Sequence, residues 1–328
     1  MTVLVTGAAG FIGYHVSAAL LARGERVIGV DNLNPYYSVA LKRARLKQLQ
    51  AHKRFAFHRV ELARPGRLEA LVKRARGVDR VVHLAAQAGV RYSLDHPRAY
   101  VESNLVAQLE VMETCRALNG LKHFVYASSS SVYGRNAKLP FAEDDRVETP
   151  QSLYAATKRA DELMAYCYAH LYRMPTTGLR FFTVYGPWGR PDMAYWLFAE
   201  AIERGKPIKL FNEGRMRRDF TYIDDVVEGV LAALDRPPAD GGPDAPPHQL
   251  YNLGNNRAED LDRFVSALER ALGKTAKRQY LPMQKGDVPA TYADVTAARR
   301  DLSFAPRTAI DEGLRRFVDW YRDYHKRR

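Results

Sequence analysis

Cysteine is almost absent from this chain of 328 residues, which contains only Cys115 and Cys167. Both lie in segments whose pattern predicts helices, so no disulfide framework is expected and a reducing compartment, the cytoplasm, is favoured. Long apolar runs are also lacking, because runs such as Val78 to Ala86 meet a charge within about a dozen residues, too short for a membrane span. The chain enters an apolar strand without a charged and then apolar leader.

Acidic residues are fewer than basic ones, 37 against 50, which gives a formal net charge of +13. The basic residues gather in the stretches Lys42 to Arg54, Arg67 to Arg80, Arg215 to Arg218 and Lys326 to Arg328. A nucleic-acid-binding surface would interleave aromatic residues with these or carry a reading motif, and neither is found, so nucleic acid is not expected as a partner. A basic surface that attracts small anionic molecules accounts for the charge.

Three glycines follow the first predicted strand, the β-branched run Thr2 to Thr6. Gly7, Gly10 and Gly13 come directly after it, and a helical repeat of apolar residues follows. At such a junction the first glycine permits a tight turn, the second lets a pyrophosphate approach the backbone, and the third lets the helix pack on the strand. The segment therefore predicts a dinucleotide-binding turn.

An acidic residue follows the second predicted strand, Arg26 to Val30. The carboxylate of Asp31 can accept both hydroxyls of an adenine ribose and would repel a 2′-phosphate, so NAD is favoured over NADP. The structural alternative is that Asp31 only caps the turn that follows it.

Strands and helices alternate over the first half of the chain. Further strands are predicted at Phe55 to Val60, Arg80 to Leu84, Lys122 to Ala127 and Thr176 to Phe181. Helices are predicted at Leu41 to Gln50, Leu68 to Arg76, Tyr100 to Leu118 and Tyr154 to Tyr172. This alternation predicts a Rossmann-type, doubly wound α/β fold with a parallel sheet.

Beyond Arg180 the pattern changes to turns, short strands and separate helices, which predicts a smaller, discontinuous α/β substrate lobe. Residues 1–181 with about 226–257 are expected to form the NAD-binding domain. Residues 182–225 and 258–328 are expected to form the second lobe. The proline- and glycine-rich stretch 236–248 predicts an exposed loop.

Tyr154 and Lys158 lie four residues apart on a predicted helix, so both project from one face. A fixed ammonium makes a neighbouring phenol easier to ionise, so Tyr154 can exchange a proton with a substrate hydroxyl. Ser129, at the end of an apolar strand, can bond the same oxygen. A surface tyrosine beside a solvated lysine is the alternative, but the glycine turn and Asp31 predict a cofactor beside the pair.

The chain resembles extended short-chain dehydrogenases/reductases, and within them NAD-dependent nucleotide-sugar epimerases. The resemblance rests on the glycine turn 7–13, Asp31, His83 to Ala86, Ser128 to Gly134, Tyr154 with Lys158, and Arg218 to Asp225. Three further strings are similar to UDP-glucuronate 4-epimerases, namely Asp31 to Tyr37, Gln87 to Ser93 and Leu179 to Ala194.

This resemblance implies NAD-dependent 4-epimerisation of UDP-glucuronate to UDP-galacturonate, with NAD tightly bound and recycled. It implies that Tyr154 takes the proton of the C4 hydroxyl while NAD takes the C4 hydride. Lys158 would hold the nicotinamide ribose, and Ser129 would share the C4 oxygen. The 4-keto intermediate would then rotate and be reduced on its other face.

The resemblance also assigns binding residues, and no metal ion is among its requirements. The cofactor set is Gly7, Gly10, Phe11, Ile12, Gly13, Asp31, Asn32, Glu61, Leu62, Ala85, Ala86, Asn104, Lys158 and Phe181. The substrate set is Gln87, Arg91, Ser130, Ser131, Thr183, Arg190, Lys209, Leu210, Phe211, Arg218, Gln284 and Asp287. A homodimer is expected through the helices 100–118 and 154–172. Glu61 departs from the family pattern, which usually has aspartate at that position.

The serines after Ser129 bear on the substrate. Ser130 and Ser131 stand where the related dehydratases carry an Asp-Glu pair and the decarboxylases a Glu, so elimination lacks its acid–base partner. A uronate carboxylate would find hydroxyl donors there, and Thr183 and Arg190 fit its recognition.

Three other readings stay open on the sequence alone. The first is a UDP-glucose or UDP-N-acetylhexosamine 4-epimerase, and the second is a UDP-glucuronate decarboxylase, which Ser131 disfavours. The third is a non-catalytic NAD-binding protein on the same fold.

Overall fold

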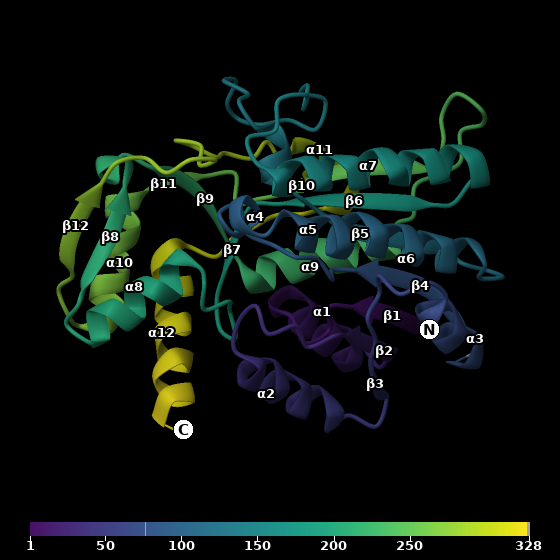
Figure 1. Ribbon diagram of the computed structural model, residues 1–328, viewed down its shortest axis with the longest axis horizontal. Coiled ribbons are helices and arrows are strands. Elements are labelled where there is room, and N and C mark those ends of the chain that lie inside the picture. Colours follow the sequence, from purple (N-terminus) through teal and green to yellow (C-terminus); the bar gives the residue numbers. More distant parts are fainter. Residues whose placement is uncertain (76, 327–328) are drawn as a thin grey trace.

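A computed structural model describes residues 1–75 and 77–326 of the chain. A parallel sheet of seven strands forms its centre, in the order β10-β6-β5-β4-β1-β2-β3 (Figure 1). The strands are β1 Thr2–Thr6, β2 Arg26–Asp31, β3 Phe55–Arg59, β4 Val78–His83, β5 His123–Ser129, β6 Thr176–Phe181 and β10 His248–Leu253. The direction in which successive strands are added reverses between β1 and β4, which is where a doubly wound fold binds its ligand.

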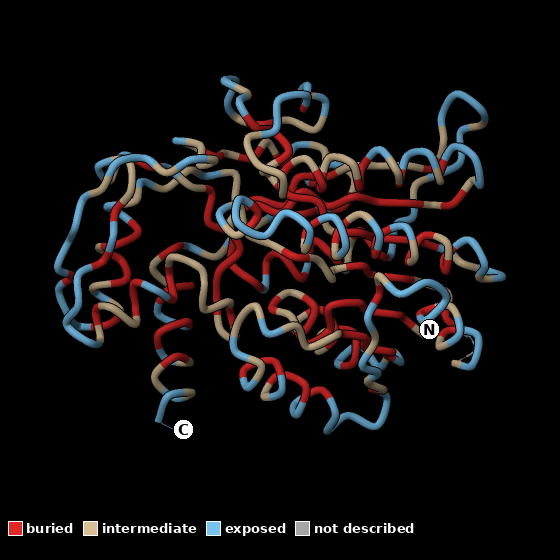
Figure 2. Tube along the Cα trace, in the orientation of Figure 1, coloured by how far each residue is buried: buried red, intermediate tan, exposed pale blue. Residues whose placement is uncertain are grey.

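Helices cover both faces of the large sheet, as the alternating pattern predicts. One face carries α1 Phe11–Ala22, α2 Val39–Gln50 and α9 Ile223–Asp235, and the other carries α3 Arg67–Ala75, α6 Ala107–Arg116 and α7 Leu153–Tyr172. Along β1, Val3 and Val5 belong to one apolar core and Leu4 to the other. Figure 2 shows the middle of the sheet as a buried layer. Strand β6 is buried along its whole length, whereas the edge strand β3 is partly exposed. The predicted fold class is therefore confirmed.

The helix predicted over 100–118 is not one regular helix. The segment consists of α5 Pro97–Tyr100, a π-helical stretch Val101–Val106 and then α6, and a four-residue helix, α4 Tyr92–Asp95, precedes it. A wider helical turn displaces one residue from the 3.6-residue repeat, so periodicity alone cannot reveal it. The predicted helix end at Arg76 and the last two residues of the basic tail lie outside the described residues.

A second lobe lies beyond the edge of the large sheet at which its strands have their carboxyl ends (Figure 1). Its sheets are built from β7 Thr183–Tyr185, β8 Pro207–Phe211, β9 Arg217–Tyr222, β11 Ala258–Asp260 and β12 Lys277–Leu281. Its helices are α8 Ala194–Glu203, α10 Leu261–Leu272 and α12 Ile310–Lys326. The helix α11 Thr296–Leu302 instead contacts α9 and β10 of the large unit. The division into two domains stays a prediction.

Residues 236–247 connect α9 to β10 and are mostly exposed, as the composition predicts. Arg173 holds this loop, because its Nε donates to the Asp240 carboxylate at 2.9 Å and its guanidinium also donates to the Gly242 carbonyl at 2.6 Å. Among the helices in residues 1–75 and 77–326, none is long and apolar enough to cross a membrane.

His123 makes stability depend on pH. It is fully buried, its Nδ1 and Nε2 lie 3.1 Å from the Leu234 carbonyl and 2.9 Å from the Thr177 hydroxyl, and burial lowers its pKa to about 4. An unfolded histidine titrates at about 6.5, so the unfolded chain gains a proton first as the pH falls. Between pH 6.5 and 4, the free energy of unfolding of wild type is therefore expected to fall by up to about 3 kcal/mol more than that of His123→Gln. The stabilising contribution of the neutral His123 is fully present above pH 6.5.

Urea unfolding of both proteins at pH 7.5, 5.5 and 4.5 measures this difference. The exposed His170 on α7 supplies the control, since His170→Gln should leave the pH dependence of wild type unchanged. Parallel stability curves for wild type and His123→Gln would refute the assignment.

Candidate active site

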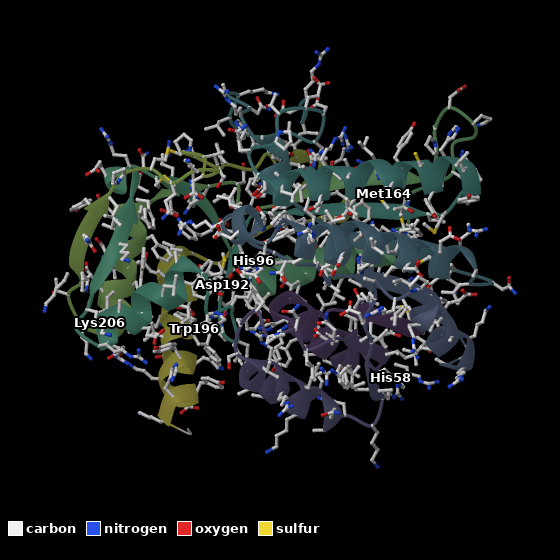
Figure 3. The ribbon with its side chains drawn as sticks, viewed as in Figure 1. His58, His96, Met164, Asp192, Trp196 and Lys206 are labelled. Carbon is white, nitrogen blue, oxygen red and sulfur yellow. The ribbon has the colours of Figure 1, made fainter. Side chains whose placement is uncertain are left out.

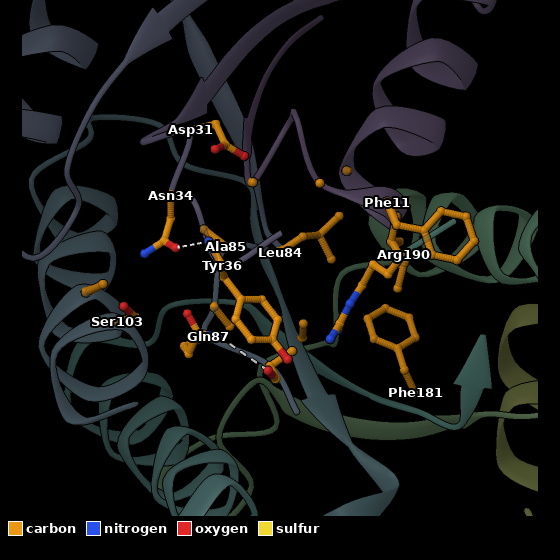
Figure 4. Close-up of a pocket in the computed structure, with 18 of the residues that line it drawn as sticks. Phe11, Asp31, Asn34, Tyr36, Leu84, Ala85, Gln87, Ser103, Phe181 and Arg190 are labelled. Atoms are coloured by element: carbon orange, nitrogen blue, oxygen red, sulfur yellow. Dashed lines mark hydrogen bonds between the residues drawn. The ribbon is translucent and has the colours of Figure 1, made fainter. Parts of the chain in front are cut away.

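A cavity lies at the carboxyl edge of the large sheet. Its walls come from the glycine turn, the ends of β2, β4 and β5, the start of α7, and the segments after β6 and β7 (Figure 4). In the catalytic and cofactor sets, Asn104 alone does not line it. Of the substrate set, only Gln87 and Arg190 line it.

The glycine turn has the geometry that its sequence predicts. Gly7 has φ +68°, and a Cβ at that position would lie 2.8 Å from the Ala85 nitrogen. A Cβ on Gly13 would lie 2.1 Å from the Gly7 carbonyl oxygen, so helix and turn touch without space for a side chain. Helix α1 begins after Gly10 with no side-chain cap and no acidic residue in its first turn. Its N–H groups thus suit an anionic ligand such as a diphosphate.

Asp31 ends β2 and lines the cavity. Its Oδ2 accepts from the Ala9 N–H at 3.2 Å and its Oδ1 from the Leu33 N–H at 2.7 Å, so it does brace the turns on both sides. A carboxylate has further lone pairs, which leaves its predicted role at the ribose compatible with this bracing. Beside it, the Asn32 amide donates to Glu61 Oε2 at 2.9 Å, so the departure from aspartate at position 61 keeps a carboxylate tied to this wall.

Asn104 holds the segment after β4 from behind. Its Oδ1 accepts from the Gln87 N–H at 2.8 Å, and its Nδ2 donates to the Gln87 carbonyl at 3.1 Å and the Thr157 hydroxyl at 2.9 Å. These bonds use both donors of its amide, and Asn104 does not line the cavity. The observed contacts show Asn104 supporting the segment after β4, and its predicted role toward the cofactor stays a prediction.

Tyr154, Lys158 and Ser129 meet at the end of β5. Ser152 caps α7 by accepting from the Ala155 N–H at 3.1 Å, which fixes the first turn of the helix that carries Tyr154. Lys158 is almost fully buried, yet it lines the same cavity as Tyr154 and Ser129. The three side chains thus share one wall, and their chemical roles stay predictions.

Asp161 is a partner of Lys158 that the sequence did not reveal. The Lys158 Nζ lies 3.0 Å from Asp161 Oδ2 and donates to the Ala127 carbonyl at 3.0 Å. Asp161 has no exposed surface, and burial raises its pKa to about 6 although Lys158 opposes the shift. A carboxylate three residues after a lysine is common on helix surfaces, so only the burial of this pair distinguishes it.

Arg190 is engaged by a neighbouring carboxylate. Its Nε and NH2 donate to the two oxygens of Asp192 at 3.1 and 2.5 Å, and the Tyr36 hydroxyl donates to the same group at 3.0 Å. Tyr36 and Arg190 point toward one another in Figure 4, and Figure 3 marks Asp192 between the large unit and the second lobe. A substrate carboxylate would therefore compete with Asp192 for the donors of Arg190.

Several lining residues were not predicted. They come from the segment after Asp31, from the segment before α6 and from the start of α8: Asn34, Tyr36, Tyr37, Lys42, Ser103 and Met193. The segment Asn34 to Lys42 follows the carboxyl end of β2, and ligands of such folds bind beyond strand ends. The place of this segment after a predicted strand end could therefore have identified it as part of the site.

The remaining substrate residues form a second group at the second lobe. Arg91 NH2 lies 3.1 Å from Asp287 Oδ2, and its guanidinium lies 4.5 Å from the centre of the Phe211 ring. Arg218 donates to the carbonyls of Val288 and Pro289 at 2.7 and 3.1 Å. These contacts join the segment after β4 to the loop before α11.

Four other predicted positions are less well placed for the substrate. Leu210 has no exposed surface, so direct contact of its side chain with a ligand is contradicted by its place in the apolar core. Lys209 is exposed on β8, and the buried Gln284 Oε1 has no hydrogen-bond partner among the described residues. Thr183 begins β7 beside the lining residue Phe182. Within residues 1–75 and 77–326 no group of three potential metal ligands is found.

The strand order, the glycine turn and the acidic end of β2 define a dinucleotide-binding protein of the Rossmann class. Comparison with known proteins is more specific. The model of the NAD dependent epimerase/dehydratase family matches residues 3–254, and the chain belongs to this family.

Relatives extend over the whole chain. "Protein CapI" of Staphylococcus aureus is 48% identical, and the match covers 100% of both chains. UDP-glucuronate 4-epimerase 4 of Arabidopsis thaliana is 49% identical over 99% of this chain and 76% of its own. A crystal structure of UDP-glucuronic acid 4-epimerase from Bacillus cereus, in complex with UDP-glucuronic acid and NAD, is similar with a TM-score of 0.90. Its sequence is 33% identical, and the match covers 99% of this chain and 100% of the other. The predicted resemblance is thereby confirmed.

Proposed function

We propose that the protein is an NAD-dependent isomerase that interconverts UDP-glucuronate and UDP-galacturonate at C4. The observation that carries the proposal is the distribution of charge in the cavity. Its acidic lining residues are Asp31 and Glu61, both at the ends of the strands far from Tyr154, within the described part of the chain. Ser130 and Ser131 follow Ser129 in the chain, do not line the cavity themselves, and bring no negative charge that would repel a uronate carboxylate.

The residues fit the cofactor of the family. The turn at Gly7 and Gly10 and the N-terminus of α1 would hold the diphosphate, Asp31 the adenine ribose, and Lys158 the nicotinamide ribose. When bound, NAD supplies reversible hydride transfer at C4 of the sugar.

The chain's own groups manage the proton. Tyr154 removes the proton of the C4 hydroxyl as the C–H bond at C4 of the sugar breaks. It returns a proton to the C4 oxygen when the 4-keto sugar is reduced on its other face. The Ser129 hydroxyl shares the C4 oxygen. The Lys158 ammonium shares the cavity wall with Tyr154, and the buried Asp161 keeps that ammonium in place. Because each cycle restores the oxidation state, the cofactor is proposed to stay bound.

The same groups must also protect the intermediate, because a 4-keto uronate is a β-keto acid that loses carbon dioxide. None of Ser130, Ser131 and Thr183 lines the cavity itself, and we propose that their hydroxyls reach the carboxylate once the sugar is bound. With no acid beside Ser129, neither a C6 elimination nor a decarboxylation receives help from a side chain. The relatives named UDP-glucuronate 4-epimerase support this reading over a decarboxylase.

One assay tests the proposal against its alternatives. The purified protein is incubated with UDP-glucuronate, UDP-glucose or UDP-N-acetylglucosamine, without added reductant, and products are followed by NMR. We expect UDP-galacturonate from the first sugar, without carbon dioxide, at a kcat/KM well above those for the neutral sugars. UDP-xylose, preference for a neutral sugar, or no turnover would each contradict it.

Arg190→Ala tests the carboxylate selectivity. Its removal leaves Asp192 as an unpaired carboxylate beside the cavity, where it repels a uronate and is indifferent to a neutral sugar. We expect kcat/KM for UDP-glucuronate to fall about ten-fold more than that for UDP-glucose. An equal decrease in kcat/KM for both sugars would show that Arg190 supports the structure of the cavity wall and does not select the carboxylate.

The double variant Arg190→Ala/Asp192→Ala is the matched control. If Arg190 acts by neutralising Asp192, the double variant regains much of the preference for UDP-glucuronate. If Arg190 contacts the substrate carboxylate directly, the preference stays lost.

We also propose a homodimer through the helices after α4 and through α7. Large apolar side chains on these helices are exposed in the single chain, with 40% of Leu109, 53% of Leu163 and 48% of Tyr166 accessible. A monomer rarely leaves such a face uncovered. Sedimentation of the purified protein measures the mass directly.

The free thiols of Cys115 and Cys167 support a reducing compartment, proposed to be the cytoplasm.

A further inference from the structure

Arg45 lies in the middle of α2 and has no exposed surface. Burying a guanidinium costs free energy unless its donors are bonded and its charge is compensated. The donors of Arg45 are bonded. Nε donates to the Trp188 carbonyl at 3.0 Å, NH2 to the carbonyls of Trp188 and Gly189 at 2.5 and 2.8 Å, and NH1 to the Ala9 carbonyl at 2.9 Å and the Tyr37 hydroxyl at 2.8 Å.

No carboxylate in the described part of the chain is in ion-pair contact with Arg45. All of its acceptors are neutral oxygens. The other fully buried arginine, Arg180, forms two bonds to Glu162 at 2.8 and 3.0 Å. The contrast shows that this chain provides a carboxylate for a buried arginine elsewhere and provides none here.

The acceptors of Arg45 belong to three walls of one cavity. Ala9 lies within the glycine turn, Tyr37 in the segment after Asp31, and Trp188 and Gly189 directly before Arg190. Gly10, Tyr37 and Arg190 all line the cavity. Arg45 therefore joins, from behind, the part of the site that suits a diphosphate to the part that carries Arg190.

A second contact follows the same route. His15 of α1 lies with its Nε2 2.9 Å from the Pro187 carbonyl, so helix α1 also holds the segment that precedes Arg190. Burial, with a smaller contribution from the charge of Arg45, lowers the pKa of His15 to about 4, so this contact brings no second charge near neutral pH. The positive field behind the turn comes from Arg45 and the N-terminus of α1.

We propose that Arg45 is a positioning residue that couples dinucleotide binding to the placement of the segment 187–190. Its unpaired charge is balanced when the diphosphate of a dinucleotide occupies the glycine turn, and its hydrogen bonds carry the resulting order to Trp188 and Gly189. The inference rests on the dinucleotide part of the proposed function and is independent of which sugar reacts.

Two substitutions separate charge from bridging. Arg45→Met removes both at similar length, while Arg45→Lys keeps the charge but cannot bond three walls at once. Lys47→Met is the matched control, because Lys47 is an exposed cation on the same helix. Each purified protein is first freed of bound NAD and its fold is checked by circular dichroism. NAD affinity is then measured by calorimetry, and amide hydrogen exchange in residues 186–192 is measured with and without added NAD, in the absence of any sugar nucleotide.

In wild type and Lys47→Met, NAD is expected to slow exchange in residues 186–192. Arg45→Met should bind NAD about ten-fold or more weaker, and Arg45→Lys within about three-fold of wild type. In both Arg45 variants exchange in this segment should be fast and should no longer respond to NAD. If NAD still slows exchange there in Arg45→Lys, the coupling role is refuted, whether or not Arg45→Met folds. Unchanged NAD affinity in a folded Arg45→Met refutes the charge role. Since no sugar is present, a wrong sugar substrate leaves these results unaffected.

Discussion

Tyr154→Phe is expected to lower kcat for UDP-glucuronate epimerisation by about 10²–10⁴-fold, with KM and NAD binding nearly unchanged. The substitution removes one hydroxyl and keeps the ring, whose centre lies 6.0 Å from that of Tyr100. The loss therefore reports the missing proton transfer at the C4 hydroxyl. Steady-state kinetics by product NMR, together with NAD retained through gel filtration, measure both quantities.

Tyr172→Phe is the control for this prediction, because Tyr172 is an exposed tyrosine at the far end of the same helix α7. It should have wild-type kcat. A decrease of less than about ten-fold for Tyr154→Phe would remove Tyr154 from the role of general acid and base.

Arg180→Met is expected to destabilise the fold by about 3–5 kcal/mol. Arg180 and Glu162 are each 1% exposed and share two hydrogen bonds, and the Ser128 hydroxyl also donates to Glu162 at 2.6 Å. Burial alone would raise the pKa of Glu162, but the hydrogen bonds and charge of Arg180 hold it below its ordinary value. Without Arg180 the carboxylate is left buried between β5, β6 and α7.

Arg159→Met supplies the comparison, since Arg159 pairs with the same carboxylate but is 32% exposed. Its loss should cost about 1 kcal/mol or less, because solvent screens the pair. The double variant Arg180→Met/Glu162→Gln should recover part of the stability. Equal losses for Arg159→Met and Arg180→Met in urea unfolding would contradict this account.

Much of the fold follows from local pattern. The β-branched run at Thr2, the glycine turn and the alternation of strands with helices predict the large sheet, and β6 has the predicted bounds of Thr176 to Phe181. Elements with mixed polarity were missed. The strand β12, Lys277–Leu281, is largely exposed and stabilised by pairing with β8, so its own residues carry little strand signal.

The candidate site was predictable where a residue type has a local meaning. Gly7, Asp31 and the Tyr154–Lys158 pair each follow from their place at a strand end or on one helix face. The charged partners of these residues were not predictable. The role of Asp161 follows from its burial beside Lys158, and Arg45 binds carbonyls more than 140 positions away in the chain. Sequence spacing cannot show such contacts.

The most direct test of the account follows the hydrogen at C4. UDP-glucuronate deuterated at C4 is incubated with the enzyme in ordinary water, and the products are examined by NMR and mass spectrometry. We expect UDP-galacturonate that retains the deuterium at C4 with inverted configuration, because the hydride leaves and returns within one bound cycle. Deuterium lost to solvent, or a product lacking the carboxylate, would contradict it.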